Sequence, residues 1–164
     1  MKPSHTSSLK SAKGTVLLLT IIALCLGLVI GHRISSTDSS SEMETALVSR
    51  IIDGDTVELL DGRRVRYLGI DTPERGEYYY KEASDRNREL VGGKTVELQR
   101  GNRDKDVYGR LLRYVFIEGV FINAELVAEG YAAAYIFDHE ERFSRVLLQL
   151  EQYARLSKHG IWDL

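Results

Sequence analysis

Three aspartates lie beside turns that end predicted strands, and their side chains could bind a cation. Asp53 and Asp55 flank Gly54 at the end of one run of strand-forming residues, and Asp71 ends another beside Thr72. Carboxylate oxygens together with a backbone carbonyl are the ligands that a hard cation such as calcium prefers. Asp-Gly-Asp and Asp-Thr-Pro are also ordinary turn sequences, so each motif taken alone favours a turn over a metal site.

Two arginines and a glutamate could act on a phosphate. The guanidinium groups of Arg66 and Arg110 would bind phosphate through paired hydrogen bonds and stabilise the extra negative charge of a transition state. Glu74 could accept a proton from water or orient the water for attack. A lone arginine or loop carboxylate is more often simply solvated. Arg66 and Asp71 are five residues apart, so they need a bulge or bend near Gly69 to meet.

The nine tyrosines are the remaining residues with a chemical role to consider. Tyr108 and Tyr135 could hydrogen-bond a phosphate or stack on a base, although packing in the core is the default for any single tyrosine. Charge narrows the function further, since the net charge is -2 and residues 45–164 hold 18 basic and 21 acidic residues. A protein that coats DNA should be strongly positive, so nucleic acid would have to contact a local site.

The N-terminal segment predicts export of the rest of the chain. Residues 15–31 carry no charge and are about as long as the shortest membrane span. Lys2, Lys10 and Lys13 precede them, so residues 1–14 should be cytoplasmic, while residues 32–44 form a Ser-rich flexible linker. The apolar segment is either an uncleaved anchor or a cleaved signal peptide. Both alternatives place residues 45–164 outside the cytoplasm. Cys25, the single cysteine, lies in this segment, so the domain has no disulfide.

Alternation and turn signals predict short strands, and 3–4 spacing predicts helices. We expect strands at 46–52, 56–60, 64–70, 94–100 and 110–117, helices at 81–91, 123–129 and 140–158, and a charged loop at 101–107. Five short strands with helices between and after them suggest a mainly β member of the α+β class. The expected architecture is a five-stranded Greek-key barrel of the OB type with about three packed helices.

Three ordered motifs resemble the thermonuclease family, the staphylococcal-nuclease-like group. They read IDGDTV at 52–57, RYLGIDTPE at 66–74 and DVYGR at 106–110. The resemblance extends from about Val48 to Trp162, with departures at Val107, where a lysine is usual, and at Phe137, where a second tyrosine is common. It implies an OB barrel with three helices that cleaves DNA and RNA with calcium and leaves 3′-phosphate ends.

The resemblance also implies a role for each candidate residue. Asp55 and Asp71 would bind calcium directly, the backbone carbonyl of Thr72 would be a further ligand, and Asp53 would act through water from the outer shell. The remaining roles concern the nucleic acid and the attacking water: Arg66 and Arg110 hold the scissile phosphate, Glu74 is the general base or orients water, and Tyr108 and Tyr135 contact a neighbouring phosphate or base.

Two functions from different classes fit these observations. The first is a calcium-dependent nuclease for DNA, RNA or both, either anchored in the membrane or secreted. It would need no obligate protein partner and is expected to be a monomer. The alternative is a catalytically weak or inactive OB-fold module, tethered to the membrane, that holds nucleic acid or protein. Because the carboxylates, both arginines and Glu74 are all present, the sequence favours the enzyme.

Overall fold

The computed structural model describes residues 43–137 and 142–163, and its central feature is a closed sheet. The strands of this barrel are β1 (Met43–Ile51), β2 (Thr56–Leu59), β3 (Arg64–Tyr67), β5 (Thr95–Lys105) and β6 (Leu111–Ile117). Neighbours in the order β3-β2-β1-β5-β6 are antiparallel, and a parallel pairing of β3 with β6 closes the sheet. The prediction of a five-stranded barrel of the OB type is confirmed.

The barrel interior is filled by aliphatic side chains that alternate with outward-facing residues along each strand. On β3, Val65 and Tyr67 are fully buried, whereas Arg64 and Arg66 face outward. The same alternation on the other strands contributes the buried residues Val48, Val57, Leu59, Leu98 and Val115. This core fixes which side chains of each strand remain available for a site on the outer surface.

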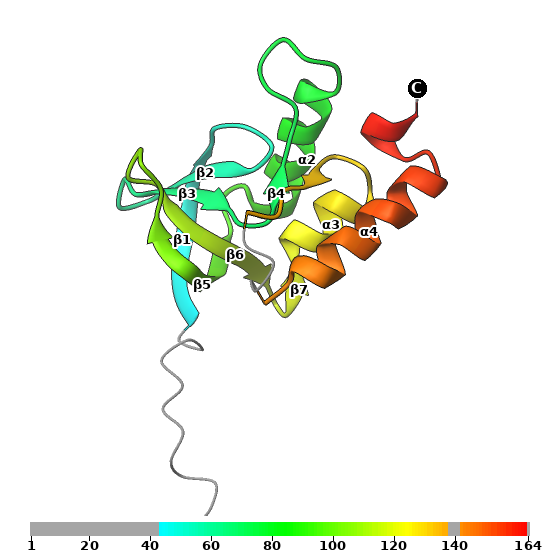
Figure 1. The fold of residues 1–164 in the computed structure, drawn as a ribbon. Coiled ribbons are helices and arrows are strands. Elements are labelled where there is room, and N and C mark those ends of the chain that lie inside the picture. The colour runs from blue at the N-terminus through cyan, green and yellow to red at the C-terminus, as the bar shows by residue number, and fades with distance from the viewer. Residues whose placement is uncertain (1–42, 138–141, 164) are drawn as a thin grey trace, which may run out of the picture. The chain divides into compact units, whose positions relative to one another are not determined.

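Three helices pack around the barrel: α2 (Tyr80–Val91), α3 (Ile122–Ala128) and α4 (Ser144–Leu156). In Figure 1, α2 rises beside the barrel while α3 and α4 lie alongside one another. Leu126 of α3 and Leu147 of α4 are fully buried in the same core, which holds both helices in place. A short 3-10 helix, Gly160–Trp162, follows α4. The predicted α+β class with three helices is therefore confirmed.

The structure corrects three predicted elements. The strand expected at 64–70 is two strands, because Gly69 has a φ of +74° and the chain bends there before β4 (Ile70–Asp71), which pairs with β8 (Ala133–Ala134). The loop expected at 101–107 is largely strand, since β5 continues to Lys105 through pairing with β6. The last helix begins at Ser144 rather than at residue 140. A short strand, β7 (Val120–Phe121), was not expected.

The predictions for the N-terminal segment fall outside the part of the chain that the structure describes. This holds for the basic residues 1–14, the apolar residues 15–31 and the linker up to residue 42. Strand β1 starts at Met43, two residues before the expected start of the domain. Within residues 43–137 and 142–163, no helix has both the length and the apolar character needed to cross a bilayer.

Candidate active site

Asp55 is anchored against Thr72 by the loop that joins β1 to β2. Its Oδ2 accepts hydrogen bonds from the Thr72 backbone N–H (2.9 Å) and from Thr72 Oγ1 (3.0 Å). This contact requires glycine at position 54, because a Cβ there would lie only 2.7 Å from Thr72 Oγ1. Asp53 Oδ1 accepts a hydrogen bond from the Asp55 backbone N–H at 3.1 Å, which closes the loop on itself. Both acidic side chains are thereby fixed in direction.

A layer of buried polar groups supports this loop from below. The Tyr67 hydroxyl donates to Asn87 Oδ1 at 3.0 Å, and Asn87 Nδ2 donates to the Asp53 backbone carbonyl at 3.0 Å. Tyr67 lies on β3 and Asn87 on α2, and both side chains are almost completely buried. Because buried polar groups cost free energy unless they are paired, this chain of hydrogen bonds fixes the Asp53–Asp55 loop to the helix.

Arg66 joins the two acidic strand ends. Its Nη1 donates to the backbone carbonyls of Tyr67 (2.8 Å) and Ile70 (2.7 Å). Its Nε lies 3.1 Å from Asp55 Oδ1, and its Nη2 lies 2.6 Å from Asp71 Oδ1. The bend at Gly69, between β3 and β4, brings Asp71 back to Arg66. This is the bend that the sequence analysis gave as the condition for these two side chains to meet. One guanidinium therefore touches both carboxylates that were predicted to bind a metal.

Burial makes Asp55 an unusual carboxylate. The side chain is 6% exposed, and this desolvation raises the pKa of Asp55 from 3.8 to about 6. The charge of Arg66 and the hydrogen bonds from Thr72 lower the pKa, while the nearby charge of Asp53 raises it, so the net effect is an increase. A cation beside Asp55 would favour its charged form, which suits a position that binds positive charge.

The oxygen donors at this place fit a hard divalent cation. Asp55 and Asp71 both lie within contact distance of one cationic group, so a single ion could reach both carboxylates. Asp71 is half exposed, which leaves room for water as a further ligand. Carboxylates, a backbone carbonyl and water together form the kind of set that calcium accepts. The described residues contain no group of three or more His, Cys, Asp and Glu side chains arranged to hold a metal.

Arg110 is held by the turn that connects β5 to β6. Asp106 Oδ1 accepts hydrogen bonds from the backbone N–H groups of Tyr108 and Arg110, both at 3.0 Å, and Asp106 Oδ2 accepts one from Arg110 Nε at 2.7 Å. Burial alone would raise the pKa of Asp106, but the hydrogen bonds from Arg110 outweigh it and lower the pKa. The carboxylate thus stays charged and orients the guanidinium, whose η nitrogens remain available for a phosphate.

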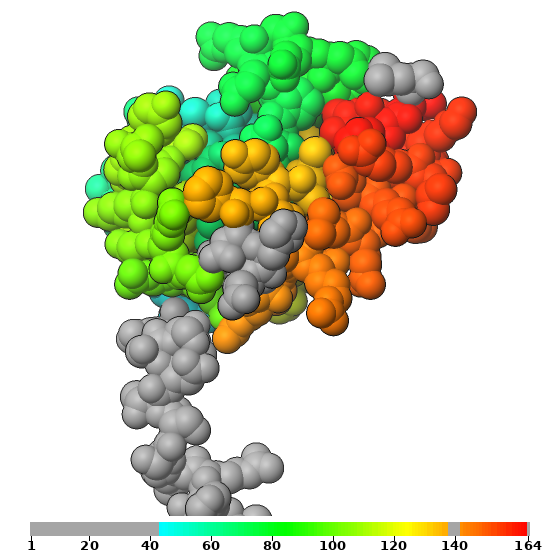
Figure 2. All heavy atoms as spheres, viewed as in Figure 1, coloured from blue at the N-terminus to red at the C-terminus, as the bar shows by residue number. Residues whose placement is uncertain are grey.

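A cleft of about 760 Å³ brings the predicted residues together. Figure 2 shows one face of the molecule, where the lime hairpin of β5 and β6 and the orange segment around β8 border one another below the green loop that precedes α2. Thr72 is buried behind Asp55 and does not line the cleft. The other eight predicted residues do: Asp53, Asp55, Arg66, Asp71, Glu74, Tyr108, Arg110 and Tyr135.

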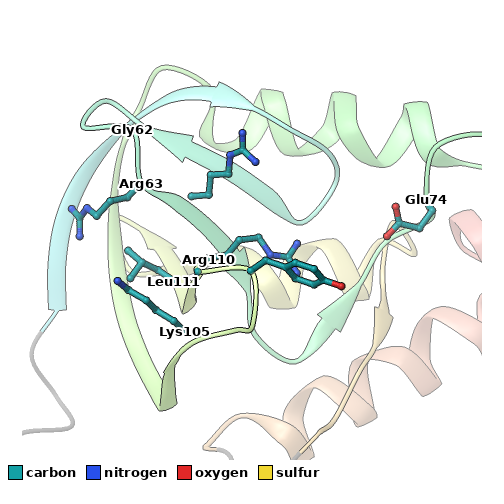
Figure 3. A pocket seen from close by; sticks show the side chains of 9 residues that line it. Gly62, Arg63, Glu74, Lys105, Arg110 and Leu111 are labelled. Carbon is teal, nitrogen blue, oxygen red and sulfur yellow. The ribbon is translucent and has the colours of Figure 1, made fainter.

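Glu74 lies in the exposed loop between β4 and α2. Its backbone N–H donates to Glu77 Oε2 at 2.7 Å, which holds the start of the loop. Its carboxylate forms no hydrogen bond with other residues that the structure describes, and Figure 3 shows it pointing toward the side of the cleft where Arg110 lies. A carboxylate opposite an arginine across a cleft can reach a water molecule that attacks a phosphate held by that arginine.

Sequence reasoning missed several residues at the rim of the cleft. The Arg103 guanidinium lies over the Phe137 ring, 4.6 Å from its centroid, so that β5 contacts the segment after β8. Lys105 also lines the cleft. Both basic residues fall in the segment predicted as a loop, and the strand that places them arises from pairing with β6. The one sign of this in the sequence is that positions 103 and 105 are two apart, so that both side chains would lie on the same face of a strand.

The fold and the site define an OB-type barrel whose two acidic strand ends are joined by Arg66 and whose cleft also holds Arg110, an arrangement that could bind a phosphate. Comparison with known proteins is more specific. The family model described as staphylococcal nuclease homologue matches residues 64–164. A thermonuclease of Staphylococcus intermedius is 32% identical over 160 residues, which cover 90% of this chain and 94% of that protein. The chain therefore belongs to the staphylococcal-nuclease-like family, as its motifs predicted.

Two relatives from Bacillus subtilis strain 168 are longer than this chain. Endonuclease YncB is 35% identical over 137 residues, which cover 76% of this chain and 64% of YncB. The SPbeta prophage-derived endonuclease YokF is 36% identical over 134 residues, which cover 74% of this chain and 45% of YokF. The chain thus spans less than two thirds of either protein. The names of these relatives and of the thermonuclease support a hydrolase that acts on phosphodiester bonds.

Proposed function

We propose that this chain is a calcium-dependent nuclease that hydrolyses phosphodiester bonds in DNA, RNA or both and leaves 3′-phosphate ends. The observation that carries the proposal is the joining of Asp55 and Asp71 by Arg66 in the cleft that also holds Arg110 and Glu74. The two arginines can place positive charge around one phosphate, and Glu74 can deliver water to it. Family membership and the names of the relatives support the same activity.

The residues of the cleft divide the chemical work among them. Arg66 and Arg110 bind the non-bridging oxygens of the scissile phosphate and stabilise the charge that develops on them. Glu74 orients a water molecule or accepts its proton as the water attacks phosphorus in line. The bond from phosphorus to the 5′-oxygen breaks, and the phosphate stays on the 3′-oxygen.

Asp55 and Asp71 would hold calcium, with Asp53 acting through a water molecule, and the carbonyl of Thr72, which lies behind Asp55, would be a further ligand. When bound, calcium would supply a positive charge that polarises the phosphate and a bound water. Asp106 keeps Arg110 in position, and Tyr108 and Tyr135 border the same cleft, where they would contact a neighbouring phosphate or base. The hydrogen bonds through Tyr67 and Asn87 would preserve this geometry during turnover.

The proposal includes a location outside the cytoplasm. Its support is the uncharged segment 15–31 behind three lysines, which would anchor the domain or be cleaved to release it. Separating cells into cytoplasm, membrane and medium, and probing each fraction for the chain with an antibody, would test this. Recovery in the cytoplasmic fraction alone would contradict it.

Cleavage of defined oligonucleotides tests the activity. The chain should cut 5′-labelled single-stranded DNA or RNA in calcium and should stop when a chelator is added. The new ends should block extension by a polymerase until a phosphatase removes the 3′-phosphate. Cutting that continues in chelator would refute the metal requirement. Tight binding without cutting under any divalent metal would instead favour the inactive binding module.

A further inference from the structure

A second cleft, of about 670 Å³, adjoins the active-site cleft and shares four of its lining residues: Glu74, Lys105, Tyr108 and Arg110. It continues over the turn between β2 and β3. In the view of Figure 3, Arg110 lies between Glu74 on one side and Arg63 and Lys105 on the other. The shared residues make the two clefts neighbours on either side of Arg110, where the scissile phosphate would lie.

The second cleft is basic although the protein as a whole is not. Four of its nine lining residues are Arg63, Arg64, Lys105 and Arg110, and Glu74 is the one acidic residue among them. The whole chain has a net charge of -2. A surface with this local excess of positive charge attracts a polyanion that the bulk charge would not attract.

The basic side chains of this cleft are not equally available. Arg63 is engaged by both Glu44 and Asp61. Arg64 Nε is 3.6 Å from Glu58, and the Arg64 side chain is 57% exposed, so its outer edge is free to bind an anion.

Lys105 is the second available cation. Its exposed ammonium makes no ion pair or hydrogen bond with the residues that the structure describes. The acidic neighbour whose pKa its charge lowers is Asp104, which is already hydrogen bonded to Arg113 at 2.8 Å. Apart from Arg110, which the proposed function assigns to the scissile phosphate, Arg64 and Lys105 are therefore the two basic groups of this cleft that can bind a ligand.

The strands place these cations in line with the active site. Arg64 and Arg66 lie on the same outward face of β3, because the buried Val65 separates them. Their side chains leave the strand about 7 Å apart, so Arg64 can reach a different phosphate from the one held at Arg66. Lys105 pairs with Leu111 across β5 and β6, and Leu111 pairs with Val65, so three adjacent strands contribute to the second cleft.

We propose that Arg64 and Lys105 form a subsite that binds a backbone phosphate of the product on the 3′ side of the cut. The phosphate that it binds is the second one after the scissile phosphate. The direction follows from the attack geometry and so rests on the proposed function. Water delivered from the side of Glu74 displaces the 5′-oxygen on the opposite side, and the nucleotides 3′ of the cut extend from that oxygen. The subsite therefore takes a single strand of DNA or RNA that continues 3′ of the scissile bond.

Chimeric oligonucleotides test this assignment in the full-length chain. One natural phosphodiester is flanked by neutral methylphosphonates, and natural linkages are then restored singly at each position on either side. Restoring the second linkage on the 3′ side should raise kcat/KM about tenfold, because the added phosphate contact lowers KM. The same change on the 5′ side should have a smaller effect. The R64Q/K105Q variant should lose the 3′ gain, whereas the exposed pair R145Q/K158Q, which removes the same charges away from both clefts, should keep it.

Salt dependence gives a second measurement. On a natural oligonucleotide, the slope of log kcat/KM against log salt should become shallower by about 0.7 in R64Q/K105Q, because the subsite neutralises one phosphate and each neutralised phosphate of a single strand contributes about 0.7. A full 3′ gain in that variant, or a gain confined to the 5′ side, would overturn the subsite. If the wild-type chain cuts none of these oligonucleotides in calcium, the proposed function fails. The subsite is then tested by binding, with the affinity for the uncut oligonucleotides measured by fluorescence anisotropy. The R64Q/K105Q variant must bind the oligonucleotide with the restored 3′ linkage no more tightly than the one in which that linkage is neutral.

Discussion

Replacing Asp55 by asparagine should stabilise the folded domain at neutral pH. Burial raises the pKa of Asp55 from 3.8 to about 6 in the folded domain, whereas the unfolded chain exposes it to water. The folded state therefore binds a proton on Asp55 more tightly than the unfolded state does. As a result, Asp55 contributes most to stability below about pH 4, and this contribution is lost as the pH rises toward and beyond 6. Asparagine keeps the shape of the side chain and removes the buried charge.

The size of the effect follows from the pKa difference. A shift of about 2 units corresponds to about 3 kcal/mol, most of which develops between pH 4 and pH 7. The difference in unfolding free energy between D55N and the wild type should therefore grow by about 2–3 kcal/mol over that range. Urea unfolding of both proteins at pH 4, 5.5 and 7, with a chelator present, measures this difference. The contributions of the other carboxylates to the pH dependence cancel, because both proteins contain them.

Two results would refute this reasoning about Asp55. One is a difference in unfolding free energy that does not change with pH, and the other is a D55N variant that loses stability relative to the wild type as pH rises. Calcium supplies a further comparison. A cation that binds the charged Asp55 should raise the stability of the wild type at pH 7 and raise that of D55N much less, which would narrow or reverse the gap.

Three further substitutions test separate parts of the site. E74Q should slow single-turnover cleavage by about 10²–10⁴-fold with an unchanged unfolding midpoint, because Glu74 is exposed; a near-normal rate would remove its role. D71N should raise the calcium concentration for half-maximal rate at least about tenfold, since one of two carboxylate ligands is lost, and an unchanged calcium titration would count against Asp71 as a ligand. D106N should cost about 1–3 kcal/mol of unfolding free energy and lower kcat/KM by releasing Arg110, and a variant with normal kcat/KM would show that Asp106 does not position it.

Much of the site could be predicted because its residues belong to short local motifs. The loop at 53–55 and the segment 66–74 each contain their chemistry within ten residues, and a bend at Gly69 was the one geometric condition needed. The structure meets that condition with a φ of +74° at Gly69 and an Arg66–Asp71 contact of 2.6 Å. Short motifs of this kind specify a turn directly, so the side chains that flank the turn are placed with it.

The rest depends on contacts between distant parts of the chain. Residues 101–105 have a charged sequence without apolar alternation, and β5 continues through them because its pairing with β6 resumes at Lys105, opposite Leu111, after an irregularity that follows Arg100. Arg103 and Lys105 therefore could not be placed in the cleft from the sequence. Asn87 sits in a polar helical segment, and its burial beneath Asp53 comes from the packing of α2 against the barrel. The calcium requirement and the N-terminal anchor remain predictions.

The central claim is that Arg110, which lines the same cleft as Asp55, Asp71 and Glu74, holds the scissile phosphate there. Single-turnover cleavage of a labelled single-stranded oligonucleotide at saturating calcium should be at least about a hundredfold slower in R110A than in the wild type. R145A should retain the wild-type rate, and all three proteins should remain folded. An R110A variant that cuts at close to the wild-type rate would show that the phosphate is not held in this cleft.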